Sequence, residues 1–157
     1  MTKVVVHVDG GARGNPGPAA VGAVVSTPAG DVLDEAAEFL GRASNNVAEY
    51  RGLLLGLDRA KALGATEVQV INDSELIAYQ VTGRYKVKHP DMKPLHAAAL
   101  EALSGFDRWS IRSVPRARNA AARQALDAFD RWSIRSVPRA QNAAADALVN
   151  QALDARS

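Results

Sequence analysis

The segment FDRWSIRSVPRA occurs twice in this chain, at 106–117 and again, letter for letter, at 129–140. Only one copy can fill a given position in a fold. Two copies are also too few for a solenoid, which needs about three repeats to bury its faces. An identical repeat at this level indicates a recent or engineered tandem duplication. The sequence therefore predicts a single domain over residues 1–157 in which one copy is surplus or inserted.

Each copy is predicted to form a strand, a proline-containing turn and then a helix. The strands are expected at 109–114 and 132–137, and the full units are 106–128 and 129–155. The segment 106–140 is also rich in arginine, with residues 108, 112, 116, 118, 123, 131, 135 and 139. Such clustering favours a polyanionic partner, although a solubilising surface explains it equally well.

Composition limits the class of protein. With 157 residues and 47% hydrophobic content, the chain is long enough for one well-buried domain. The absence of cysteine excludes disulfides and thiolate zinc sites. There is no basic-then-apolar leader and no apolar run of membrane-spanning length, so we expect a soluble, cytoplasmic protein without a membrane partner.

Hydrophobic periodicity predicts an α/β fold. The opening reads as three strands in an antiparallel meander, with a loop over 10–18, where glycine and proline are dense. A long helix, a strand, a short helix and an Ala/Leu-rich helix follow. This order predicts a mixed sheet with helices packed on it. The expected strands are 4–8, 20–26, 32–40 and 67–72, and the expected helices are 47–63, 74–81 and 92–103.

Four carboxylates stand where a metal site would need them. Asp9 and Asp73 are expected at strand ends, Glu49 in the first turns of the long helix, and Asp146 near the start of the last helix. Hard divalent cations such as magnesium take oxygen ligands, and two such ions can act on a phosphodiester. Turn formation, helix capping and interaction with the helix dipole explain each acid equally well. The residues alone therefore leave a metal-dependent nuclease as one of several readings.

Four motifs in this order resemble those of the type 1 ribonuclease H family. They are DGGARGNPGPAAVGAVV (9–25), SNNVAEYRGLLLGL (44–57), INDSEL (71–76) and RAQNAAADALVNQAL (139–153). The resemblance covers essentially the whole chain apart from one copy of the repeat. It implies a ribonuclease H-like, five-stranded mixed sheet, with its first three strands antiparallel, flanked by helices. It also implies hydrolysis of the RNA strand of RNA–DNA hybrids, leaving a 3′-hydroxyl and a 5′-phosphate.

The resemblance also implies roles for individual residues. The ligands of two magnesium (or manganese) ions would be Asp9, Glu49, Asp73 and Asp146. Contacts along the minor groove of the hybrid, where the 2′-hydroxyl distinguishes RNA from DNA, would come from Gly11, Asn15, Asn45 and Asn46. Ser44 would hold a DNA phosphate near the helix start.

Two departures from the family pattern affect these expectations. Many members carry a histidine in the loop before the last helix, whereas this chain has Pro138–Gln141 there. Arg139 is expected to contact phosphate or product, but its pKa excludes ordinary proton transfer. The histidines of this chain lie on other elements and are interpreted as structural or surface residues: His7, His89 and His96. The segment 84–89 is short, which indicates a form without the basic protrusion.

The duplication is the third departure. The first copy has Arg123 where the second has Asp146. If the second copy takes the sheet position, the fourth carboxylate is supplied and the chain is an active endonuclease, our leading hypothesis. If the first copy takes it, a cation would face the site, which predicts a catalytically impaired hybrid-binding module. We expect a monomer, with a domain-swapped dimer as the alternative. A transposase- or resolvase-like nuclease of the same fold fits the glycine and asparagine positions less well.

Overall fold

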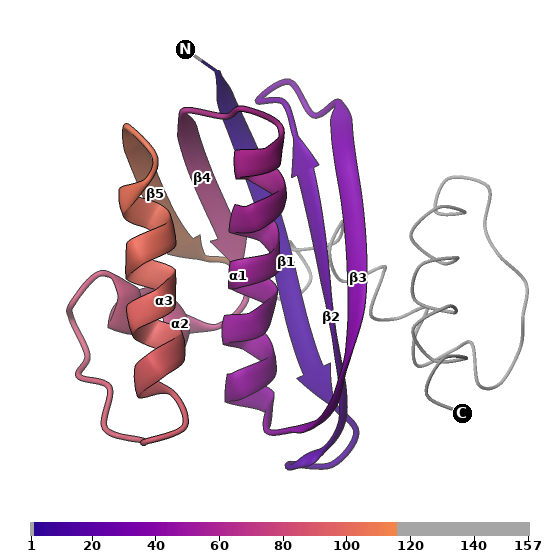
Figure 1. Cartoon of the computed structure of the whole chain (residues 1–157), viewed down its shortest axis with the longest axis vertical. Helices are drawn as coiled ribbons and strands as arrows, with labels where there is room; N and C mark the ends of the chain where they lie inside the picture. The colour runs from indigo at the N-terminus through magenta and orange to yellow at the C-terminus, as the bar shows by residue number, and fades with distance from the viewer. Residues whose placement is uncertain (1, 116–157) are drawn as a thin grey trace, which may run out of the picture.

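A computed structural model describes residues 2–115 of the chain (Figure 1). One five-stranded sheet carries the fold, with the strand order β3-β2-β1-β4-β5. The strands are β1 (Lys3–Ala12), β2 (Gly17–Ser26), β3 (Val32–Ala43), β4 (Glu67–Asn72) and β5 (Arg108–Ser113). The helices are α1 (Asn45–Ala62), α2 (Glu75–Val81) and α3 (Lys93–Ser104).

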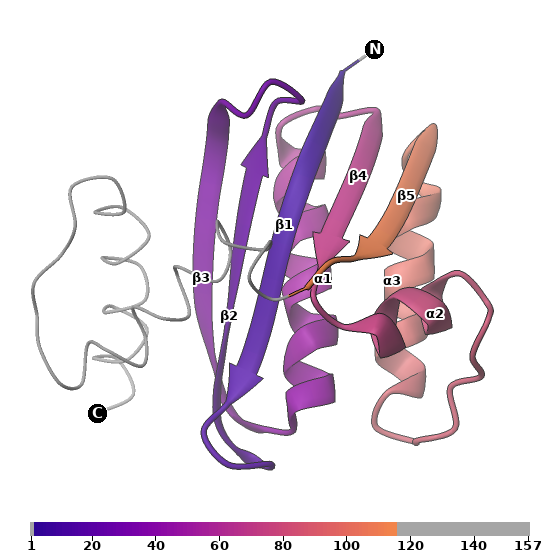
Figure 2. The same ribbon diagram turned by 180° about the vertical axis from the view of Figure 1, so that it is seen from behind.

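The topology confirms the predicted mixed sheet. Strand β1 pairs antiparallel with β2, and β2 antiparallel with β3, whereas β1–β4 and β4–β5 are parallel pairs. Helices α1 and α3 cover one face of the sheet, and α2 lies near the end at which β4 finishes (Figures 1 and 2). Of the helices in residues 2–115, none has the length and apolar character needed to cross a membrane.

The expected loop over 10–18 is wrong at both ends. Strand β1 continues to Ala12 and β2 begins at Gly17, so that only 13–16 lie between them. Gly10 pairs with Val21 in this extended ladder. A glycine can extend a strand where another backbone comes too close for a side chain. A Cβ at Gly10 would lie 2.4 Å from the carbonyl oxygen of Ala48 in α1.

Helix α1 lies unusually close to β1 because small residues face the sheet. Four of them, spaced one helical turn apart, are buried: Ala48, Gly52, Gly56 and Ala60. A Cβ at Gly56 would lie 2.6 Å from the Cγ1 atoms of both Val6 and Val8. At Gly52 it would lie 3.2 Å from the carbonyl oxygen of Asp9. The first half of α1 is therefore held directly against the part of β1 that contains Asp9.

A buried polar contact joins all three helices. The Tyr50 hydroxyl of α1 donates to Oε1 of Gln80 in α2 at 2.6 Å. Nε2 of His96 in α3 lies 3.0 Å from the Gln80 carbonyl oxygen, and its ring meets the Tyr50 ring edge-on. Burial raises the pKa of Tyr50 to about 12. His96 is thus a structural residue, as predicted.

Strand β5 belongs to the first copy of the repeat. It spans Arg108–Ser113 and pairs in register with β4, from Glu67–Arg108 to Asn72–Ser113. The expectation that the second copy takes this position is therefore wrong for the described structure, in which the first copy forms β5. The connection from α3 is short, which favours the copy that comes first in the chain. Residues 129–155 lie outside the described part of the chain.

We predict that Gly10→Ala destabilises the fold by about 1–3 kcal/mol, since its Cβ would press on backbone atoms of α1 that have little freedom to move. Gly11→Ala is the matched control, because no atom lies within 4 Å of the Cβ it would add. Urea unfolding should show the loss for Gly10→Ala only. Equal midpoints for the two variants would contradict the close approach.

We also predict that Tyr50→Phe lowers the free energy of unfolding by about 1–3 kcal/mol, because it leaves the buried Gln80 side chain without its donor. Adding Gln80→Leu to Tyr50→Phe should recover part of this loss, since neither polar group then remains. A double-mutant cycle measured by urea unfolding tests the coupling. Additive effects would show that the two side chains are not coupled.

Candidate active site

Asp9 lies inside β1 and not at its end, which corrects the expected position. Asp9 is 3% exposed, and its cross-strand partner on β2 is Gly22. Because that neighbour has no side chain, no bulk from β2 crowds the carboxylate. Burying an ionised carboxylate is costly unless charge or hydrogen bonds compensate it. A buried aspartate here is therefore unusual for a purely structural residue.

Asp73 reaches the same end of the sheet from the neighbouring strand. The parallel register places His7 beside Ile71, and Asp9 and Asp73 each stand two residues further along. The paired register ends at His7 and Ile71, so Asp9 and Asp73 stand on two neighbouring chain segments just beyond the same end of this ladder. Asp73 directly follows β4 and precedes the N-cap of α2, where the Ser74 hydroxyl accepts from the Ile77 N–H.

Glu49 comes from α1 and completes the described acidic group. The ideal Cβ position of Gly10 lies 2.9 Å from the Glu49 backbone nitrogen, so this residue sits directly over the strand next to Asp9. The side chain is partly buried. The three acidic residues predicted from sequence thus lie toward one end of the fold, on β1, just after β4 and in the first turns of the helix packed on β1.

Asn72 is a further polar residue at this end of the sheet, and no sequence motif assigned it a role. It is 5% exposed, and its Oδ1 atom is buried with no hydrogen-bond partner within residues 2–115. It follows Val68 and Val70, both core residues, at alternating positions of β4. A polar side chain at an inward position of an apolar strand is a signal that the sequence already contains. An amide oxygen beside Asp73 adds a further acceptor to the acidic end.

The donor chemistry of this group fits a hard divalent cation. Magnesium and manganese prefer carboxylate and amide oxygens, and all the donors here are of that kind. Within residues 2–115, no three acidic or imidazole side chains form a group that would hold an ion by itself. The described residues are thus a partial donor set, and the fourth predicted ligand, Asp146, lies outside residues 2–115.

The side chains of two asparagines predicted to contact substrate accept hydrogen bonds from backbone N–H groups across the start of α1. The Asn45 N–H donates to Oδ1 of Asn15, and Oδ1 of Asn45 accepts from the Ala12 N–H, each at 3.0 Å. These bonds attach the 13–16 loop to the first turn of α1. Because both Oδ1 atoms accept hydrogen bonds from backbone N–H groups, the Nδ2 amino groups are the atoms of these side chains that could donate to a ligand. Both asparagines are exposed.

The other predicted contact residues lie around the same helix start. Ser44 is the N-cap of α1, its hydroxyl accepting from the Val47 N–H at 3.2 Å. Asn46 is in the first turn and partly exposed. Open space surrounds the Cβ position of Gly11, so that a ligand can approach the backbone there. Arg139 lies outside the described residues.

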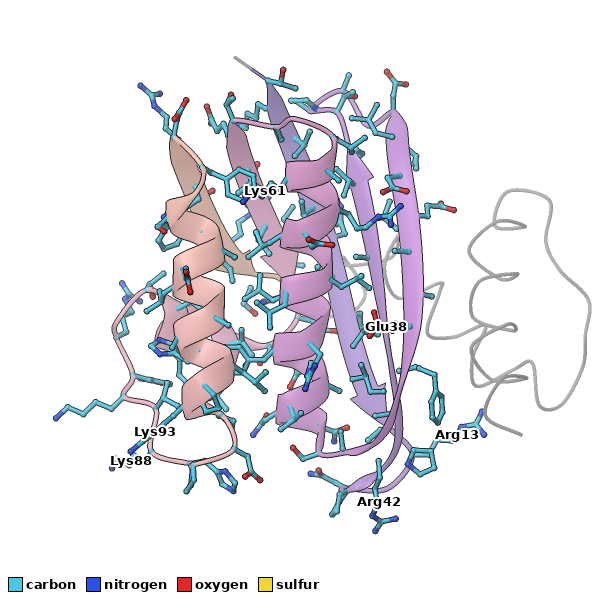
Figure 3. All side chains as sticks on the ribbon, in the orientation of Figure 1. Arg13, Glu38, Arg42, Lys61, Lys88 and Lys93 are labelled. Atoms are coloured by element: carbon cyan, nitrogen blue, oxygen red, sulfur yellow. The ribbon has the colours of Figure 1, made fainter. Side chains whose placement is uncertain are left out.

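Basic side chains stand on either side of this end of the molecule. Figure 3 shows Arg13 and Arg42 to one side and Lys88 and Lys93 to the other. All four residues are exposed. An acidic centre between basic flanks suits a polyanion whose phosphates contact the flanks while a metal ion neutralises the centre.

His7 lies on β1 two residues before Asp9 and is partly buried. Burial, and secondarily the positive charge of Arg112 on β5, lower its pKa below the ordinary value. It is therefore neutral at physiological pH. His89 is exposed, in agreement with the prediction of a surface residue, and its Nδ1 atom lies 3.9 Å from Oδ2 of Asp91.

Known proteins resemble this chain over most of its length. A sequence profile of the reverse transcriptase-like family matches residues 7–126. The bifunctional protein Rv2228c of Mycobacterium tuberculosis is 56% identical over 118 residues, which make up 74% of this chain and 32% of that protein. The chain therefore spans about a third of the length of this curated relative.

Two solved structures share the fold over nearly their full length. The crystal structure of RNase H1 from Halobacterium salinarum is 38% identical with a TM-score of 0.76, and the match covers 98% of both chains. LC11-RNase H1, isolated from compost by a metagenomic approach, was solved in complex with an RNA/DNA hybrid. It is 37% identical with a TM-score of 0.73, over 77% of this chain and 91% of that chain.

We predict that Asn45→Ala lowers the free energy of unfolding by about 1 kcal/mol, because the Ala12 N–H loses its acceptor. Asn45→Asp should keep the stability, since it keeps the acceptor and adds negative charge in the first turn of α1. Thermal unfolding of both variants measures the difference. Equal losses would show that the acceptor atom is not what matters.

Proposed function

This chain belongs to the ribonuclease H1 family, and on that premise we propose that it hydrolyses the RNA strand of RNA–DNA hybrids. The observation that supports the proposal is that Asp9, Glu49 and Asp73 come from three neighbouring elements at one end of the sheet. The hybrid-bound relative has this fold at 37% identity, which supports the same class of substrate. The products would be a 3′-hydroxyl and a 5′-phosphate.

The proposed metal ligands are Asp9, Glu49, Asp73 and Asp146, which would hold two magnesium or manganese ions. When bound, such ions activate water and stabilise the leaving oxygen of a phosphodiester. The protein supplies rigidity. Asp9 is held within a paired strand, and Glu49 is on a helix that lies close to that strand through small residues. The carboxylates therefore need little rearrangement when an ion binds.

Recognition of the hybrid is proposed to come from the start of α1 and the adjacent loop. The Nδ2 donors of Asn15 and Asn45 suit the acceptors of base edges and 2′-hydroxyls in a wide, shallow minor groove. Gly11 and Asn46 would add contacts along the same groove, and Ser44 would hold a DNA phosphate near the helix start. The arginine proposed for phosphate or product contact is Arg139.

A second candidate function follows from the identity of β5. Because the first copy occupies the sheet, the residue that follows β5 at the spacing of the fourth carboxylate is Arg123. A cation there would repel a second metal ion. In that arrangement the chain would bind hybrid but cleave it poorly. The two candidates differ in turnover and not in affinity for the hybrid.

We predict magnesium-dependent cleavage of an RNA–DNA hybrid, with duplex DNA and duplex RNA left intact. Asp73→Asn should reduce the rate by more than about 100-fold, because it removes a negatively charged ligand. Asp91→Asn is the control, since Asp91 is exposed in the α2–α3 connection. No cleavage by the parent, combined with tight hybrid binding, would favour the second candidate. Cleavage that survives Asp73→Asn would overturn the proposed site.

A further inference from the structure

We propose that the outer edge of β4 is a docking site for either copy of the repeat, so that 131–136 replaces β5 in a second arrangement of the same chain. The occupant of the site is thus a segment of the chain itself. The exchange does not rest on the proposed function, whereas its catalytic consequence does. Three features of the described structure carry the inference: the bonds of β5, its side-chain contacts and its connection to α3.

The bonds that hold β5 in place come from the backbone. Beyond the ladder with β4, the Asp107 N–H donates to the Thr66 carbonyl at 2.8 Å, and the Val114 N–H donates to the Asn72 carbonyl at 2.7 Å. Such bonds do not depend on residue type. Any extended segment without proline at these positions would form them equally well. The edge of β4 therefore does not select between the copies by hydrogen bonding.

The side-chain contacts do not select either. Phe106 is 7% exposed in the core, and Ile111 packs against the same cluster. The remaining side chains of β5 are mostly exposed. The second copy supplies Phe129 and Ile134 at the same positions of an identical sequence. Each packing interaction of the strand would be reproduced on exchange.

The connection to α3 is what separates the two arrangements. In the structure only Gly105–Asp107 join α3 to β5. With the second copy docked, the connection would be 105–130. Loop-closure entropy disfavours this lengthening by roughly 25-fold, since the probability of closure falls as the 3/2 power of loop length. The second arrangement would then be a minor state of a few per cent, within reach of a ligand that prefers it.

A divalent cation is such a ligand. Arg123 follows Ser113 at the same spacing as Asp146 follows Ser136, so docking one copy or the other changes the charge delivered to the acidic end. A cation that binds only the Asp146 arrangement shifts the ratio in proportion to its concentration above Kd. Binding of metal and hybrid would thereby shift the population from the arrangement with the first copy docked, which carries Arg123, to the arrangement with the second copy docked, which carries Asp146.

Engineered disulfides can trap each arrangement, because the chain contains no cysteine of its own. Gln69 of β4 and Ser110 of β5 are register partners. Adjacent strands bring Cα atoms within the range that a disulfide bridges. Gln69→Cys with Ser110→Cys would trap the first copy, and Gln69→Cys with Ser133→Cys would trap the second. Gln69→Cys with Ser136→Cys is the matched control, since position 136 is out of register with 69.

We expect monomeric cross-links in both test pairs under mild oxidation, identified by peptide mass. Without magnesium the Ser133→Cys pair should react roughly 25-fold more slowly than the Ser110→Cys pair, in line with the loop entropy. Magnesium should raise its rate at least several-fold and slow the first pair. The Ser136→Cys control should react more slowly than either pair.

Three results would overturn the exchange. These are no intramolecular link in the Ser133→Cys pair, a link no faster than the Ser136→Cys control, or links found only between chains. The cleavage assay then tests the consequence separately. If both pairs link but the Ser133→Cys form does not cleave hybrid, the exchange stands and the proposed function fails. If the cross-linked Ser110→Cys form cleaves as fast as the parent, the claim that docking of the second copy brings Asp146 to the active site is wrong.

Discussion

The fold depends on how closely α1 approaches β1. A helix normally rests on a sheet through side chains, but here Ala48, Gly52, Gly56 and Ala60 turn a nearly bare backbone toward the strand. The contact is tight enough that carbonyl groups and valine methyls fill the space where a Cβ would stand. Because packing of this kind leaves few alternative positions, the helix is fixed along and across the strand. The relative placement of Asp9 and Glu49 is a consequence of that contact.

Around this contact the polar groups reinforce the same geometry. The Asn15–Asn45 pair fastens the loop after β1 to the first turn of α1, and the Tyr50–Gln80 bond fastens α1 to α2. Three carboxylates gathered without a cation would repel one another, so a site of this kind requires a scaffold that does not relax. The buried hydrogen bonds and the glycine contacts supply that rigidity. The exposed basic residues on either side give the same end of the fold a means of attracting a polyanion.

The two copies of the repeat have the same strand sequence and differ in their distance from α3 along the chain, so the effect of chain position can be considered by itself. Both copies carry the same strand sequence, and in the described copy Phe106 and Ile111 pack into the core. Nothing local distinguishes them. The copy seen in β5 is the one reached from α3 by a short connection, which is an effect of chain entropy and not of side-chain chemistry. The proposed fourth ligand, Asp146, belongs to the second copy alone, so its delivery to the site would depend on the length of this connection.

The sequence by itself determined the element types and order and the mixed sheet, because periodicity, caps and motif spacing are local signals. It placed Asp9 at a strand end, and it did not single out Asn72. Only the tertiary structure decided that β1 runs on to Ala12, since the reason is the α1 backbone lying over Gly10. The bond from the Asn45 backbone N–H to the Asn15 side chain and the Tyr50–Gln80 bond were also decided by the tertiary structure. Such contacts join residues far apart in the chain, and no local pattern encodes which distant group arrives.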